Sequence, residues 1–271
     1  MKPGTNIKWQ ARRALHGARL WPTLEKGRLL ASLVSKRPHE RDFAFFSRFE
    51  GKPGLFLDVG ANIGQSAVSF RIYNRSFDIL SLEPNPLLEP ELRFVKRLLG
   101  SRFQYRMVGA GERDETRPIY VPRVQGVPFP QEASFVPGQL ARDPAFRNRL
   151  RAATGRDDRP VELSEVPLSI LRVDGLGIKP SVVKLDVQGF ELEALRGMTE
   201  TLATARPLLM IENGEGMAEL RELLVGMGYS EPRSCRGTSL GALDPQHPSL
   251  NLFFVPDEKA GEWTGQGWIS G

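Results

Sequence analysis

The chain has 271 residues, of which 40% are hydrophobic and 25% charged, enough apolar material for one full-sized globular domain. It contains no apolar stretch of about 18 residues and no short apolar segment behind the basic N-terminus, so it predicts neither a membrane span nor a secretory signal. The single cysteine, Cys235, excludes an internal disulfide and a cysteine-based metal cluster. We therefore expect a reduced, cytoplasmic setting and no metal site.

The net charge of +5 is concentrated at the N-terminus. Residues 1–41 hold ten Lys and Arg against two acids, a balance of +8, which leaves −3 for the rest of the chain. A basic arm of this kind binds nucleic acid or an anionic membrane surface, or is simply a solvated helical extension. Few aromatic residues accompany the charges, which disfavours a nucleic-acid partner. The sequence indicates no oligomeric state.

Two helices are predicted before the first strand. Leu24–Ser35 has the spacing of an amphipathic helix, and residues 40–49 predict a second helix whose phenylalanines, Phe43, Phe46 and Phe49, face the core. A Gly- and Pro-rich break follows at residues 51–54. We therefore assign residues 1–50 to a basic helical extension and residues 51–271 to the main domain.

The main domain opens with LFLDVGANIGQSAVSF, residues 55–70. A short apolar run reaches Asp58, a glycine-punctuated turn follows, and helical apolar spacing continues from Ile63. This pattern predicts a buried strand that feeds a helix through a turn whose backbone N–H groups hold a polar or anionic cofactor group. The glycine spacing is G-x-x-x-G, so the G-x-G-x-x-G dinucleotide fingerprint is not met.

A second apolar run, residues 79–82, ends at Glu83, 19 residues after Gly64. A carboxylate at this place in a β-α-β unit can accept both hydroxyls of a ribose. A predicted helix then ends at Gly100, and residues 103–108 alternate as a third strand. The repeated order of strand and helix predicts a doubly wound α/β sheet.

The texture changes between about residues 116 and 167, where eight prolines fall and long apolar periodicity is lacking. So long a stretch favours a substrate-covering insertion, with a loose surface loop as the alternative. Regular spacing returns at residues 181–187, a buried strand that contains Lys184 and Asp186. A helix, a strand ending in Glu212, a further helix and a last strand at residues 252–255 follow.

Four acids lie where parallel strands are expected to end: Asp58, Glu83, Asp186 and Glu212. Ligands of open α/β sheets bind outside the carboxyl ends of the strands. A single acid there is commonly a cap for the next helix. Four on one edge predict a functional site, because burying carboxylates without partners would be costly.

Five motifs follow one another in the chain: DVGANIGQS, SLEPNP, MVGAG, VVKLDVQGFELEALRG and LLMIEN. In this order they resemble the FkbM family of S-adenosylmethionine-dependent methyltransferases, over about residues 39–256. The first and fourth motifs are the most specific. The resemblance implies a Rossmann-like class I methyltransferase fold with a mostly parallel twisted sheet and helices on both faces. It also implies O-methylation of a hydroxyl on a sugar, glycan or secondary metabolite, with S-adenosyl-L-methionine as cofactor.

The resemblance assigns site residues as well. The cofactor residues that it implies are Asp58, Gly60, Asn62 and Gly64 for the methionine part, Glu83 and Asn85 for the ribose, and Gly109 and Ala110 for the adenine. Asp186 would lie beside the methyl sulfonium and is the first candidate base. Glu212 is the second candidate, and Glu191 would also face the acceptor.

Two positions depart from the family pattern. Gln188 stands where the family usually has Glu, and Ser169 stands where it usually has Asp. The loss of two carboxylates affects acceptor chemistry more than cofactor binding, since glutamine can orient a hydroxyl but cannot take its proton. Two alternatives therefore stay open. One is a non-catalytic cofactor-binding module, and the other is an NAD-binding oxidoreductase, against which the glycine spacing and the LDVQGFE segment argue.

Overall fold

The computed structural model describes residues 21–134, 160–214, 216–244 and 249–270, together with residues 144, 147, 148, 151 and 246. Predictions for the basic arm before residue 21 and for most of the proline-rich stretch between residues 135 and 159 fall outside this part of the chain.

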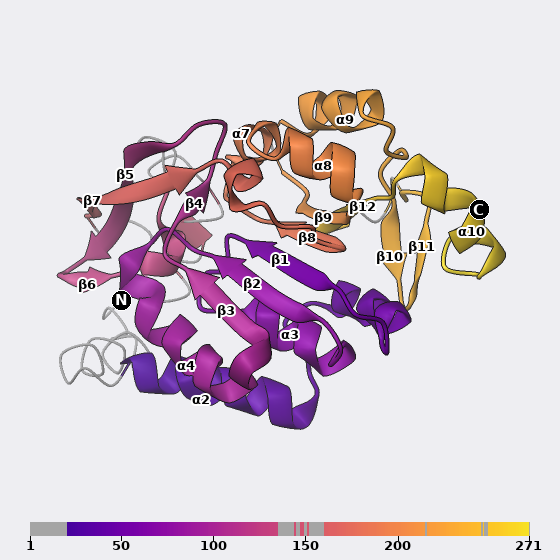
Figure 1. The fold of residues 1–271 in the computed structure, drawn as a ribbon. Coiled ribbons are helices and arrows are strands. Elements are labelled where there is room, and N and C mark those ends of the chain that lie inside the picture. Colours follow the sequence, from indigo (N-terminus) through magenta and orange to yellow (C-terminus); the bar gives the residue numbers. More distant parts are fainter. Residues whose placement is uncertain are drawn as a thin grey trace.

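A six-stranded sheet with the strand order β12-β9-β8-β1-β2-β3 forms the centre of the molecule (Figure 1). Its strands are β1 (Leu55–Val59), β2 (Asp78–Leu82), β3 (Phe103–Arg106), β8 (Val182–Leu185), β9 (Leu208–Glu212) and β12 (Asn251–Phe254). All neighbours pair in parallel except β12, which runs antiparallel to β9. The strand order reverses direction at β1, between β2 and β8. These pairings confirm the predicted doubly wound, mostly parallel α/β fold, and they place its switch point at β1.

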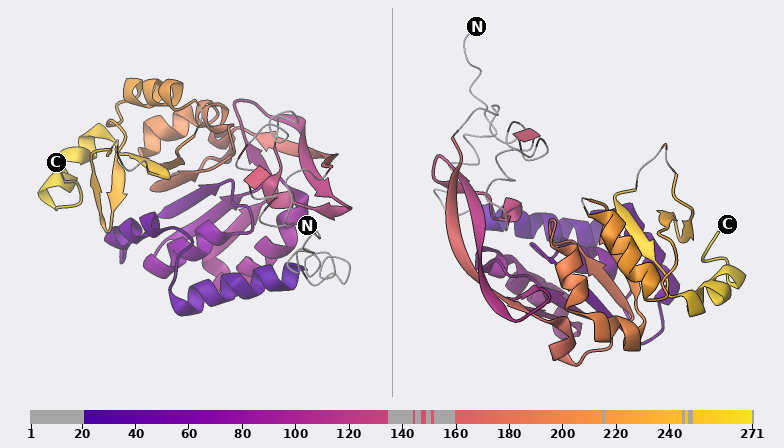
Figure 2. Two further views of the ribbon diagram at one scale, coloured as in Figure 1. Left: turned by 180° about the vertical axis from the view of Figure 1, so that it is seen from behind. Right: turned by 90° about the horizontal axis from the view of Figure 1, so that it is seen from above.

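Helices cover both faces of this sheet (Figures 1 and 2). One face carries α2 (Trp21–Ser35), η1 (Arg41–Phe49), α3 (Gln65–Tyr73) and α4 (Glu89–Leu99), and the other carries α7 (Glu191–Arg196), α8 (Thr199–Ala205) and α9 (Met217–Gly226). Alternate residues of β1 divide between the two hydrophobic cores, with Phe56 on one side and Leu57 on the other. A hairpin of β10 (Ser234–Arg236) and β11 (Ser239–Gly241) and the helix α10 (Asp257–Gly265) complete one end. None of the described helices is long and apolar enough to cross a membrane.

The two helices predicted before β1 are present as α2 and η1. The phenylalanines of η1 are buried, and Phe45, which the sequence did not single out, is buried with them. They pack in one cluster with Phe56 of β1 and Phe70 of α3, whose rings stack with centroids 4.1 Å apart. Residues 41–49 therefore share the core of the sheet, while the division of the chain at residue 50 stays a prediction.

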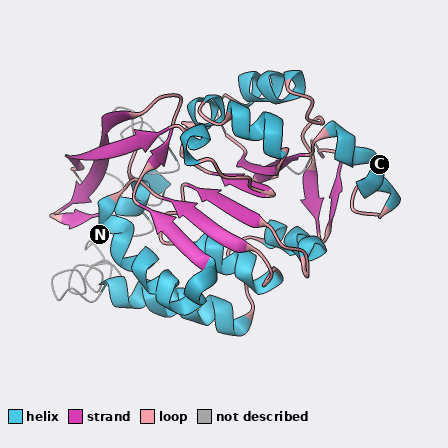
Figure 3. Ribbon diagram, in the orientation of Figure 1, coloured by secondary structure: helices cyan, strands magenta, loops and turns pink. Residues whose placement is uncertain are grey.

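A second sheet, which the sequence did not indicate, lies near the carboxyl ends of β1, β2 and β3 (Figures 1 and 3). It has the order β4-β7-β5-β6, with β4 (Gly109–Ala110), β5 (Glu115–Val124), β6 (Val127–Pro128) and β7 (Glu162–Leu171). The long pair of β5 and β7 is antiparallel, and Pro118 faces Pro167 in its register. Facing prolines fit a non-hydrogen-bonded pair, in which neither residue has to donate an N–H to the other strand. The prolines that hid these strands are therefore compatible with them.

Candidate functional site

The turn after β1 lies directly against the turn after β8. Gly60, Asn62 and Gly64 have φ values of +82°, +53° and +88°, in the left-handed region. A Cβ atom built on Gly60 would lie 1.7 Å from the backbone oxygen of Asp186. The glycine is therefore required both by its own conformation and by the close approach of the second turn.

We expect Gly60→Ala to lower the free energy of unfolding by about 2–4 kcal/mol, because left-handed strain adds to the clash with Asp186. Gly51→Ala is the matched control, since Gly51 has a φ of +81° and open space around its Cβ position. That change should cost only about 1 kcal/mol. Urea denaturation of both variants measures the difference, and equal losses would show that the two turns separate without cost.

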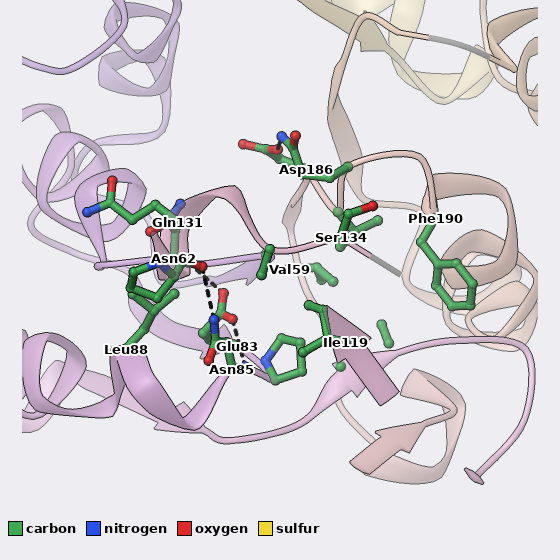
Figure 4. Close-up of a pocket in the computed structure, with 18 residues that line it drawn as sticks. Val59, Asn62, Glu83, Asn85, Leu88, Ile119, Gln131, Ser134, Asp186 and Phe190 are labelled. Carbon is green, nitrogen blue, oxygen red and sulfur yellow. Dashed lines mark hydrogen bonds between the residues drawn. The ribbon is translucent and has the colours of Figure 1, made fainter. Parts of the chain in front are cut away.

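A pocket opens at the carboxyl ends of β1, β2 and β8, and residues of the second sheet form its far wall (Figure 4). Its empty volume, open mouth included, is about 740 Å³. Seven of the residues that the resemblance implied line it: Gly60, Asn62, Glu83, Asn85, Gly109, Ala110 and Asp186. The structure thus brings both ends of the predicted site together in one cavity.

Glu83 is a fixed and buried carboxylate in this pocket. Its Oε2 accepts a hydrogen bond from the backbone N–H of Asn62 at 2.8 Å, and its Oε1 accepts one from that of Asn85 at 2.9 Å. Burial raises the pKa of Glu83 to about 7, although both backbone hydrogen bonds favour the charged form. Each oxygen keeps a second lone pair, so the carboxylate can accept two further hydroxyls.

Asn62 supplies an unsatisfied group at the same place. Its side-chain Oδ1 is buried and has no hydrogen-bond partner among the described residues. A buried polar atom without a partner is costly in a finished protein interior and is commonly satisfied by a ligand or water. Together with Glu83, it makes this end of the pocket fit a polar ligand that bears hydroxyls.

Two of the predicted cofactor residues are not among the described residues that line the pocket. Asp58 is fully buried one position before the end of β1, where it accepts a hydrogen bond from Ser81 Oγ at 3.0 Å and faces Lys184 in the strand register. A Cβ on Gly64 would lie 2.8 Å from Val95 Cγ2 of α4, so this glycine allows α3 and α4 to pack closely. Asp58 and Gly64 therefore support the turn after β1 through contacts away from the pocket.

At the β8 side, a buried lysine holds the carboxylate that faces the pocket. Lys184 has a side-chain exposure of 1%, and its Nζ donates to Asp186 Oδ2 at 2.8 Å. Burial alone would raise the pKa of Asp186, but the Lys184 ammonium outweighs it and holds this pKa below its usual value. Asp186 is therefore an ionised acceptor at neutral pH.

Gln188 joins Asp186 to Glu212. Its Nε2 lies 3.2 Å from Asp186 Oδ1 and 3.1 Å from Glu212 Oε2, so one amide donates to both carboxyl groups. Burial and the neighbouring charge of Asp186 raise the pKa of Glu212 to about 8. At neutral pH Glu212 keeps its proton while Asp186 is ionised, so these two carboxyl groups together carry one proton. Gln188 stands between them as a hydrogen-bond donor.

The raised pKa of Glu212 makes stability depend on pH. A carboxyl whose folded pKa exceeds its unfolded value of 4.5 adds stability that is complete below 4.5 and is lost as the pH rises toward 8. We expect Glu212→Gln to remove this loss, which should stay well below the limit of about 1.4 kcal/mol per pH unit because Glu212 is partly exposed and screened by solvent. Denaturation from about pH 5 to about pH 8 tests this prediction. The control is Glu222→Gln, a change at an exposed residue of α9. If the free energy of unfolding of Glu212→Gln fell with pH as steeply as that of wild type, the prediction would be wrong. A shallower fall should remain in the variant, because the pKa of Glu83 is also raised.

Glu191 and Ser169 lie elsewhere. The Oε1 of Glu191 accepts the backbone N–H groups of Val187 and Gly189, at 3.0 and 3.2 Å, and so closes the turn in which Gln188 has a φ of +56°. Ser169 is exposed on β7. Neither is among the described residues that line the pocket, so an acceptor-facing role for Glu191 stays a prediction.

The sequence favoured a substrate-covering insertion over about residues 116–167, but it did not single out the residues that form the far wall of the pocket. This wall includes Ile119 of β5 and a segment at residues 130–134, while Phe190, in the loop between β8 and α7, lines the opposite side. Only contacts made across the fold bring these residues to the pocket, so local sequence patterns gave no signal for them. No group of metal-binding side chains occurs in the described ranges.

Comparison with known proteins finds similarity to methyltransferases. The family model of the methyltransferase FkbM domain matches residues 58–231, more than half of the chain. The hexuronic acid methyltransferase AglP of Haloferax volcanii is 27% identical over 176 residues, which cover 63% of this chain and 61% of that protein, so the chain spans about three fifths of this relative's length.

Two solved methyltransferase structures are also similar. A methyltransferase FkbM from Methylobacillus flagellatus KT has a TM-score of 0.48 at 17% identity, covering 78% of this chain and 48% of its own. The 1,6-didemethyltoxoflavin-N1-methyltransferase of Burkholderia thailandensis, solved with S-adenosylhomocysteine, has a TM-score of 0.34 at 13% identity and covers 86% of both chains. On the match of the family model, the chain belongs to the methyltransferase FkbM domain family.

Proposed function

We propose that this protein uses S-adenosyl-L-methionine to methylate a hydroxyl oxygen of a sugar, glycan or secondary metabolite. The observation that carries the proposal is the fixed carboxylate of Glu83 beside the unpartnered Oδ1 of Asn62, in a pocket that also contains Asp186. When bound, the cofactor supplies an electrophilic methyl group. The residues of this chain bind and orient the reactants around it.

The pocket offers a suitable partner for each part of the cofactor. Glu83 would accept the two ribose hydroxyls through its remaining lone pairs. The buried Oδ1 of Asn62 and the N–H groups of the turn would hold the polar end of the methionine part. The apolar side chains of Leu88 and Ile119 would pack against the adenine ring of the cofactor.

Asp186 would act as the general base. Lys184 keeps it ionised and Gln188 orients it, so it would accept the proton of the acceptor hydroxyl while Glu212 stays protonated. General base catalysis contributes about 10²–10⁴-fold in rate, whereas holding the reactants in a near-attack geometry contributes about 7–11 kcal/mol. The missing family carboxylate at Gln188 would therefore slow such an enzyme without abolishing its activity.

The relative AglP, a hexuronic acid methyltransferase, favours a sugar as the acceptor class. Transfer of a labelled methyl group from S-adenosyl-L-methionine into hexuronic acid and neutral sugar glycosides, and into fractionated host extract, tests the proposal. Wild-type protein should label a fraction that Asp186→Ala does not. If thermal shift shows binding of S-adenosylhomocysteine but no acceptor is labelled, the protein is a non-catalytic binder. Stabilisation by NAD alone would identify an oxidoreductase instead.

A further inference from the structure

The far wall of the pocket is attached to the second sheet by backbone hydrogen bonds. Its segment, Pro130–Ser134, follows β6 and begins with the short helix η4 (Pro130–Glu132). Ser134 exchanges two backbone hydrogen bonds with Tyr120 of β5, at 2.9 and 3.1 Å, and the N–H of Phe129 donates to Pro122. The segment is thus fastened to β5 at both ends, and four of its five residues line the pocket.

One buried side chain joins the first residue of this wall to the turn after β2. Asn85, which is 1% exposed, donates from Nδ2 to the backbone oxygen of Pro130 at 2.9 Å. Its Oδ1 accepts the N–H of Leu87 at 3.1 Å, and its backbone N–H donates to Glu83. Both ends of the Asn85 amide are therefore engaged by the protein, and the same residue touches the carboxylate that faces the ribose position (Figure 4).

A second contact ties the second sheet to the opposite side of the pocket. The Arg117 guanidinium of β5 lies 4.9 Å from the centroid of the Phe190 ring, which also lines the cavity. Glu115 holds Arg117 in place through an ion pair at 3.2 Å. The second sheet, to which the wall is bonded, thus contacts the loop before α7 through Arg117. The wall itself is bonded to Asn85, next to Glu83.

We propose that Asn85 is a positioning residue, whose amide holds the Pro130–Ser134 wall over the nucleoside part of the cofactor. The sequence placed Asn85 beside the ribose as a cofactor contact. Its side chain instead couples the wall to the turn that presents Glu83, so that the pocket closes around a bound nucleoside only while this hydrogen bond is intact. The nature of the nucleoside rests on the proposed function, whereas the attachment of the wall does not.

Asn85→Ser tests this assignment. Serine keeps an oxygen that can accept the N–H of Leu87 but cannot reach Pro130, so the turn is kept while the connection to the wall is lost. Asn74→Ser is the matched control. Asn74 is also buried, accepts N–H groups of its own turn and donates to the backbone oxygen of Phe46. It precedes β2, whereas Asn85 follows this strand, so Asn74 lies at the end of β2 away from the pocket.

Two measurements decide the result. Asn85→Ser should weaken S-adenosylhomocysteine binding by about tenfold in calorimetry and speed hydrogen exchange of the Phe129, Glu132 and Ser134 amides. Asn74→Ser should lower the melting temperature yet keep the dissociation constant within about twofold. Unchanged exchange in Asn85→Ser, or equal loss of affinity in both variants, would overturn the assignment. If wild-type protein ignores S-adenosylhomocysteine, the proposed function fails, and the exchange rates alone decide the role of Asn85.

Discussion

Asp186→Asn is expected to lower kcat for methyl transfer by about 10²–10⁴-fold, because the variant keeps the shape of the side chain but cannot accept a proton. Affinity for S-adenosylhomocysteine, which lacks the positive charge of the methyl donor, should change by less than about tenfold. Steady-state kinetics with a labelled methyl donor and calorimetry with the product measure the two effects separately. The expected result is a large loss in kcat with little loss in product binding.

The control for this experiment is Asp174→Asn. Asp174 accepts the backbone N–H groups of Glu200 and Thr201 at the start of α8, and it is not among the described residues that line the pocket. Its variant should lose stability without losing kcat. If Asp186→Asn kept kcat within about threefold of wild type, proton transfer would have to be assigned to another group, with Glu212 next in line.

Lys184→Met is expected to lower the free energy of unfolding by about 3–5 kcal/mol, since it leaves buried carboxylates without their cation. Lys184 is almost fully buried and donates to Asp186. Burial would lower its pKa, but the charges of Asp186, Asp58 and Glu40 raise it above the ordinary value. The penalty should shrink as the pH falls toward about 4, because Asp58 and Asp186 then take up protons in the variant.

Lys179→Met is the matched control, because Lys179 is exposed just before the same strand. That change should stay within about 0.5 kcal/mol of wild type. Urea denaturation at neutral pH compares the two variants. Equal stability would mean that the carboxylates around Lys184 are already neutral in the folded protein, which would also remove Asp186 as an ionised base.

The first sheet could be predicted because its signals are local. The strands β1, β2, β8 and β9 are mainly apolar and end at or just before an acid or a glycine. The turn after β1 needs glycines for reasons that its own conformation explains. The prediction that acids gather at one edge also follows from strand ends alone. Glu83, Asp186 and Glu212 lie at or just after the ends of β2, β8 and β9, while Asp58 lies one residue further in.

A covering insertion over about residues 116–167 was expected, but its fold as a second sheet and the identity of the wall residues could not be predicted, because both depend on pairing across the chain. β5 meets β7 about forty residues later, and prolines interrupt the alternation that would identify either strand. The hydrogen bond from Asn85 to Pro130 has the same origin, since it exists only once the second sheet has formed. In the sequence, Lys184 is a charged residue inside an apolar strand. Its burial is explained by the carboxylates of Asp58 and Asp186, which the fold brings next to it.

Titration calorimetry of S-adenosylhomocysteine into wild-type protein and Glu83→Gln tests whether Glu83 holds the nucleoside of the cofactor, with Glu222→Gln as the exposed control. We expect wild type and Glu222→Gln to bind the nucleoside with equal affinity. Glu83→Gln should bind it at least about tenfold more weakly, because one of the two acceptor oxygens becomes a donor. Absence of binding to the wild type, or equal binding to all three proteins, would contradict this role of Glu83.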